Sequence, residues 1–204
     1  MRWDRLFDDL EGQLEHELSA EELDQHAEEE RLRLGRLSLR DRFLAVHEHF
    51  GRGEDYAVAV QLSSGEPLTL RPSSFGRDWF AADVVDGTVR RAPHPAQCIV
   101  PLAAVGALLL TRAQVEASLT PLAAEAGPGS LSARLTLPFV LRDLCRRRAG
   151  VDLRTPAGDV HGTIDRVGRD HLDLAVHEAD RPRRESSVQQ YRVVPLDQLL
   201  LVRV

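Results

Sequence analysis

The chain has 204 residues, 43% of them hydrophobic, which is enough for one or two packed domains. Its net charge of −6 at pH 7 excludes the strongly basic composition typical of nucleic-acid-binding domains. The acidic N-terminus excludes a signal peptide, and the longest apolar stretch, about 12 residues from Ile99 to Leu110, is too short to span a bilayer. We therefore expect a cytoplasmic protein without a membrane partner.

An acidic segment with helical periodicity opens the chain. Residues 1–35 hold 12 acidic and 4 basic side chains. Apolar residues recur in it at spacings of three and four, as on one face of a helix: Trp3, Phe7, Leu10, Leu14 and Leu18. Ser19 and Glu22 match a capping box that begins a second helix, which Gly35 would end. We expect a helical arm whose apolar stripe binds a second copy or a protein partner; packing on the chain's own body is the alternative.

Short strands are predicted twice along the remaining chain. Segments of alternating apolar and polar residues follow one another between Val151 and Val204, separated by turns at Gly158 and Gly168. Two of the tripeptides in this region also occur earlier, in the same order: Gly76-Arg77-Asp78 recurs as Gly168-Arg169-Asp170, and Val100-Pro101-Leu102 recurs as Val194-Pro195-Leu196. This pattern predicts an internal repeat, and about five short strands in each copy are typical of a small barrel.

A helix is expected before each set of strands, over Leu37–Phe50 and Leu135–Arg148, with Ser38 and Thr136 as suitable N-caps. The predicted fold class is therefore α+β: an N-terminal helical arm followed by two tandem small β-barrel repeats, each led by a helix. The expected boundaries are the acidic arm at 1–35, the first helix-plus-barrel repeat at 36–120, a linker at 121–130 and the second repeat at 131–204.

The second set of strands resembles the first motif of Sm-like proteins. Gly158 and Gly162 precede Asp170-His171-Leu172-Asp173-Leu174, as glycines precede an Asp–X–aliphatic–Asn–aliphatic step in that family. The resemblance implies a small barrel in which Asp173 occupies the place of a base-contacting Asn. Val194-Pro195 stands where the family has an Arg-Gly pair, and PRC-type and other SH3-like barrels share the pattern equally well. The whole chain also resembles proteins of high-GC actinobacteria, a likeness that implies no function.

The sequence offers no catalytic motif, so we expect a protein that is not an enzyme and has no cofactor. His47 and His49 are about 200° apart on a helix and could not share a metal. Asp78 and Asp170 sit at turns, where Asp commonly accepts backbone N–H bonds. No small-molecule substrate is evident. We therefore expect a non-catalytic protein-interaction or oligomerisation module.

RNA binding is the alternative function. Arginines concentrate before and within the second set of strands, where they could neutralise phosphates: Arg146, Arg147, Arg148, Arg169, Arg183 and Arg184. Aromatic side chains for base stacking are scarce nearby. In this hypothesis the acidic arm shields the arginines in the free protein and is autoinhibitory.

Overall fold

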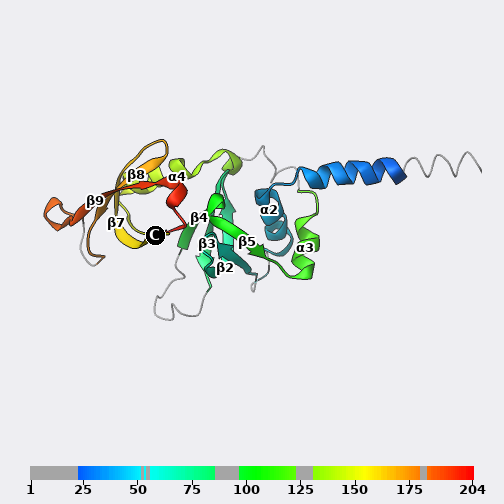
Figure 1. Cartoon of the computed structure of the whole chain (residues 1–204), viewed down its shortest axis with the longest axis horizontal. Coiled ribbons are helices and arrows are strands. Elements are labelled where there is room, and N and C mark those ends of the chain that lie inside the picture. Colours follow the sequence, from blue (N-terminus) through cyan, green and yellow to red (C-terminus); the bar gives the residue numbers. More distant parts are fainter. Residues whose placement is uncertain (1–22, 52, 54–55, 86–96, 123–130, 180–182) are drawn as a thin grey trace, which may run out of the picture. The chain divides into compact units, whose positions relative to one another are not determined.

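The computed structural model describes residues 23–51, 53, 56–85, 97–122, 131–179 and 183–204 (Figure 1). The chain divides into two compact units, Met1–Ser38 and Leu39–Val204, and each is considered by itself. In the described part of the first unit, residues 23–35 are helical and nearly all exposed. Its Arg33 pairs with Glu30 one turn earlier, at 2.6 Å between Nε and the carboxylate. This helix is polar on most of its surface, as solvent-exposed helices are.

The second unit is built on one antiparallel sheet of ten strands, in the order β5-β1-β2-β3-β4-β10-β6-β7-β8-β9. One half of the sheet consists of β1 (Val58–Leu62), β2 (Pro67–Phe75), β3 (Trp79–Val84), β4 (Gln97–Pro101) and β5 (Val105–Leu109). The other half consists of β6 (Gly150–Thr155), β7 (Gly158–Val167), β8 (His171–Val176), β9 (Gln190–Pro195) and β10 (Leu201–Arg203). Short 3₁₀ turns, η1 (Leu102–Ala104) and η4 (Leu196–Gln198), follow β4 and β9.

The sheet is open and continuous, so the prediction of two tandem SH3-like or Sm-like barrels forming an internal repeat is wrong. The C-terminal strand β10 joins the halves: Val202 pairs with Ile99 of β4 on one side and with Leu153 of β6 on the other. Among the described residues, β5 pairs only with β1 and β9 only with β8. The recurring Gly-Arg-Asp tripeptides do form the same local turn, but the strands that they connect belong to one sheet.

Two hydrophobic clusters lie against this sheet, and β10 contributes to both. The first includes Phe43 and Phe80, which are fully buried. The second contains Leu153 and Leu172. Leu201 belongs to the first cluster and its neighbour Val202 to the second, because successive side chains of a strand point to opposite faces. Strand β10 therefore ties the two clusters together.

The described part of the second unit also contains the helices α2 (Leu39–Phe50), α3 (Arg112–Ser118) and α4 (Leu137–Arg147). The helices predicted before each set of strands are confirmed as α2 and α4, each about two residues shorter at its start. Helix α2 packs its buried Phe43 and Val46 into the first cluster and lies beside α3 (Figure 1). Helix α4 packs on β7 and buries Leu141 in the second cluster.

Gly162 permits a close approach of two backbones inside β7. The sequence predicts a bulge or bend here; the structure places the irregularity in pairing slightly later, between Ile164 and Arg166. At Gly162 itself, a Cβ atom would lie 2.4 Å from the carbonyl oxygen of Ala175 in β8. Glycine is needed there because any side chain would collide with main-chain atoms that cannot move aside.

No helix in the described part of the chain is both long and apolar enough to cross a membrane.

Candidate protein-interaction site

Strand β9 is a free edge of the sheet and carries exposed apolar side chains. It pairs with β8 from Gln190 opposite Val176 to Pro195 opposite His171, and no described strand pairs with its other side. Tyr191 is 59% exposed and Val193 is 68% exposed. Their neighbour Val194 points the other way and is buried in the second hydrophobic cluster. A sheet edge presents unpaired N–H and C=O groups, so this strand can accept another strand.

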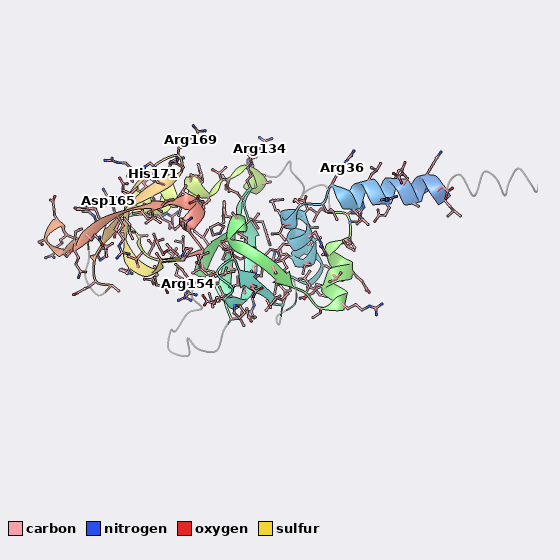
Figure 2. The ribbon with its side chains drawn as sticks, viewed as in Figure 1. Arg36, Arg134, Arg154, Asp165, Arg169 and His171 are labelled. Carbon is pink, nitrogen blue, oxygen red and sulfur yellow. The ribbon has the colours of Figure 1, made fainter. Side chains whose placement is uncertain are left out.

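Two hollows adjoin β9. The first, here called the junction groove, has a volume of about 620 Å³ and is walled by Val193 and Pro195 of β9 together with Leu102, Leu137 and Leu196. Its lining is mainly apolar and also includes ionisable side chains, here called its rim: Asp78, Arg169, Asp170, His171 and Asp197. A concave apolar surface with a few polar groups is the usual form of a binding site. Figure 2 shows Arg169 and His171 close together at this edge, with Arg154 elsewhere in the unit.

Local hydrogen bonds hold the rim of the junction groove. The Asp78 carboxylate accepts from the backbone N–H of Leu137 at 2.7 Å and so caps α4; the side chain of Thr136, the N-cap residue, makes no capping bond. Asp78 and Asp170 each accept a backbone N–H through their main-chain oxygens, from Leu102 and Leu196 respectively. The structural role expected for these aspartates is confirmed for Asp78, whereas the carboxylate of Asp170 pairs with the side chain of His171.

His171 and Asp170 form a polar pair on the rim. The ring Nδ1 of His171 lies 2.8 Å from the Asp170 carboxylate. The hydrogen bond from His171 lowers the pKa of Asp170 below its ordinary value, so this carboxylate stays charged in mild acid. The Asp170 carboxylate of this pair is a negative group in the lining of the junction groove.

The second hollow, here called the edge hollow, also adjoins β9 and has a volume of about 370 Å³. It is bounded by all six residues of β9, by Gln198, and by the β6–β7 turn at Thr155, Pro156 and Ala157 with Val160 beyond it. Arg192 is the one charged side chain among the described residues that line it. Val193 and Pro195 line both hollows, so a strand added to β9 would run beside both of them.

Four of the six arginines proposed for RNA are engaged by two carboxylates. Asp143 pairs with Arg146 and with Arg147, the latter at 2.7 Å. Asp165 pairs with Arg148 at 3.0 Å and with Arg183 at 2.6 Å. The hydrogen bond that Arg183 donates to the Asp165 carboxylate raises the pKa of Arg183 above its ordinary value. The arginine surface is thus partly neutralised by its own chain.

The two other predicted arginines lie in different places. Arg169 is on the rim of the junction groove. Arg184 precedes the 3₁₀ turn Glu185–Ser187 (η3), and its backbone N–H donates to the Ser187 hydroxyl at 2.9 Å. The six predicted arginines therefore do not converge on one site. Asp173, which the Sm-like resemblance places at the base-contacting position, lies 3.8 Å from Arg166 instead.

The partner-binding residues predicted in the arm lie outside the described residues: Trp3, Phe7, Leu10, Leu14 and Leu18. The described continuation of the arm has exposed apolar residues: Leu23 is 70% exposed and Leu32 is 51% exposed. Self-association through the arm therefore stays a prediction.

Replacing Leu10 and Leu14 together by Asp should abolish self-association if the arm forms the interface between two copies of the chain. Two charges in an apolar helix–helix contact leave buried carboxylates without partners. Analytical ultracentrifugation over a range of concentrations measures the oligomer. Replacing Glu11 and Glu15 together by Gln changes neighbouring positions of the same stretch and should leave association intact. If the variant with both Asp substitutions still forms the oligomer, the arm is not the interface.

The exposed edge of β9 was not predicted, although Tyr191 to Val194 was expected to be a strand. The sequence indicates only weakly that β9 is an edge strand, because Tyr191 and Val193 on its exposed face are the only residues that distinguish it from a strand inside the sheet. No family model, no curated protein and no solved structure matches the chain. The resemblance to Sm-like proteins therefore gains no support from relatives, and function must be argued from the site.

Proposed function

We propose that this protein is an interaction module that binds an extended segment of a partner protein along the free edge of β9. The observation that carries the proposal is an edge strand whose exposed residues Tyr191 and Val193 stand between two hollows. In this mode the partner's main chain pairs with the edge, and its alternate side chains fill pockets on either face.

The lining of the two hollows describes the segment that fits. The junction groove offers apolar walls, so it accepts an aliphatic or aromatic side chain. The edge hollow holds Arg192, whose Nε donates to the Gln190 side chain at 2.9 Å. A segment that complements both has apolar residues at every second position and an acidic residue facing Arg192.

RNA binding stays the alternative, and the structure favours it less. Asp143 and Asp165 already pair with four of the arginines that it needs. Phosphates would have to displace these carboxylates, although exposed ion pairs are weak enough for that to happen. The mainly apolar walls of the junction groove are poorly suited to a phosphate backbone.

Selection of short random peptides on the full-length protein tests the proposal. Selected peptides should alternate apolar residues with others, and their affinity should fall at least about tenfold when Val193 is replaced by Asp, because a charge on the edge opposes strand addition. Val204→Asp is the matched control, since Val204 is 57% exposed and lies outside both hollows.

Both variants should keep the unfolding temperature of the parent within a few degrees, because both residues are exposed. Equal peptide affinity for the parent and for Val193→Asp would contradict the proposal. Binding of single-stranded RNA that Val193→Asp leaves unchanged, with no peptide enriched, would favour the alternative.

A further inference from the structure

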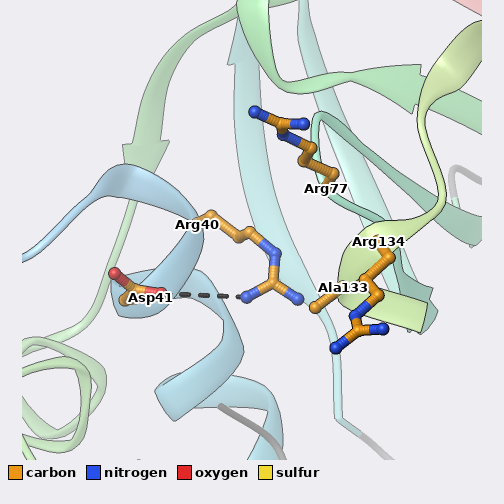
Figure 3. Close-up of a pocket in the computed structure, with 5 residues that line it drawn as sticks. All are labelled: Arg40, Asp41, Arg77, Ala133 and Arg134. Carbon is orange, nitrogen blue, oxygen red and sulfur yellow. Dashed lines mark ion pairs between the residues drawn. The ribbon is translucent and has the colours of Figure 1, made fainter. Parts of the chain in front are cut away.

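Three arginines from distant parts of the second unit surround one pocket. Arg40 comes from the first turn of α2, Arg77 from the turn before β3, and Arg134 from the 3₁₀ turn Ser132–Arg134 (η2). The pocket has a volume of about 400 Å³, and Asp41 and Ala133 complete its lining (Figure 3). It is called the arginine pocket below. Strand β9 and its two hollows contribute no residue to it.

Contacts of the turn at Gly76–Trp79 fix the side chain of Arg40 and the backbones that carry Arg77 and Arg134. The Nε of Arg40 donates to the carbonyl oxygen of Gly76 at 2.7 Å. The backbone N–H of Arg77 and the indole Nε1 of Trp79 both donate to the carbonyl oxygen of Leu135, at 2.8 and 3.0 Å. Since Leu135 directly follows Arg134, one turn fixes the backbones from which Arg77 and Arg134 project. The pocket is thus built by the fold.

Positive charge in the arginine pocket exceeds negative charge. Asp41 is the one carboxylate among the described residues of its lining, and it lies 3.7 Å from Arg40. The Arg40 side chain is only 12% exposed. In Figure 3 the side chain of Arg77 extends upward and that of Arg134 downward in the view, and the guanidinium of Arg40 lies to the left of Arg134. Three like charges around one cavity repel one another, and an anion placed among them removes that cost.

We propose that the arginine pocket binds the phosphate group of a small soluble molecule. A guanidinium binds phosphate through paired N–H donors. A phosphate carries oxygens in several directions and suits cations that approach from three segments, whereas a carboxylate offers two oxygens in one plane and suits a single arginine. The described residues that line the pocket include no aromatic side chain that could stack on a nucleic-acid base. The exposed Arg77 and Arg134 swing inward to close on the ligand.

Isothermal titration of the full-length protein with pyrophosphate tests this site. The parent should bind one pyrophosphate per chain, and Arg134→Gln should weaken binding at least about tenfold, because a hydrogen bond between two charged groups is lost. Arg112→Gln is the control: Arg112 is 94% exposed, lies on α3 and pairs only with Glu116 among the contacts described. It should leave the affinity unchanged. Arg134→Gln is preferred to Arg40→Gln, since loss of the bond to Gly76 endangers the fold.

Two competing ligands distinguish the source of the anion. Malonate should bind several-fold more weakly than pyrophosphate, and equal affinity would overturn the assignment to phosphate. A peptide with one phosphoserine should bind no more tightly than pyrophosphate; clearly tighter binding would overturn the assignment to a small molecule. No binding of pyrophosphate by the parent, or equal binding by Arg134→Gln, would overturn the site itself. These results leave the proposal for β9 unaffected, because Arg134 and Val193 lie in separate hollows.

Discussion

Replacing Leu201 by Ala should destabilise the whole second unit by about 2–5 kcal/mol in one cooperative transition. Leu201 is 1% exposed and packs in the first hydrophobic cluster. Its strand also carries Val202 into the second cluster and pairs with both β4 and β6. A cavity beside Leu201 therefore loosens the strand that pairs the two halves of the sheet with each other.

The fluorescence of Trp79 shows whether the loss of the Leu201 side chain also destabilises the second cluster. Trp79 packs in the second cluster, so its fluorescence follows that cluster, while far-ultraviolet circular dichroism follows the sheet as a whole. Measured in a Trp3→Phe background, both signals should shift together, by roughly 2–4 °C for each kcal/mol lost. Leu109→Ala on the edge strand β5, where the side chain is 47% exposed, should have a small effect. Two separate transitions, with only the first cluster affected, would show that the halves fold independently.

Gly162→Ala should be nearly as damaging, with a loss of about 2–3 kcal/mol in the free energy of unfolding. The added Cβ would lie 2.4 Å from the Ala175 carbonyl oxygen, and main-chain atoms in a sheet can relieve this contact only by separating β7 from β8. Chemical denaturation measures the loss.

Gly150→Ala is the matched control for this change. Gly150 is on the neighbouring strand β6, but a Cβ there would meet nothing closer than 3.5 Å, the His161 ring. The two substitutions add the same methyl group, so any difference reports the fit at Gly162. Equal and small effects at both positions would mean that β7 and β8 are packed less closely than the structure shows.

The local elements of this fold could be predicted from the sequence, but the pairing that unites them could not. Periodicity located α2 and α4 and most strands, because helices and strands follow local patterns. The pairing of β10 with β4 joins Val202 to Ile99, about a hundred residues apart, and no local pattern records it.

One signal for the central place of β10 was present. Leu199, Leu200, Leu201 and Val202 are four consecutive apolar residues, a pattern typical of a strand buried on both faces. A barrel strand with one face in solvent would alternate instead. The four consecutive apolar residues therefore argue against a closed barrel with one face in solvent.

In the candidate sites, too, contacts between residues close in sequence could be predicted, whereas contacts that depend on the fold could not. Asp143 stands three and four residues before Arg146 and Arg147, so this ion pairing was visible in the sequence. The contacts of Asp165 with Arg148 and Arg183 span 17 and 18 residues and depend on the fold. The arginine pocket depends on it still more, because Arg40, Arg77 and Arg134 come together only through the turn at Gly76–Trp79.

Hydrogen–deuterium exchange of the full-length protein, with and without a selected peptide, tests binding at β9 most directly. Main-chain pairing with a new strand protects the free amides of the edge, so exchange should slow in residues 190–195 and remain unchanged in the other edge strand, β5. A peptide that binds at full occupancy without slowing exchange in β9, or that protects β5 instead, would contradict the account.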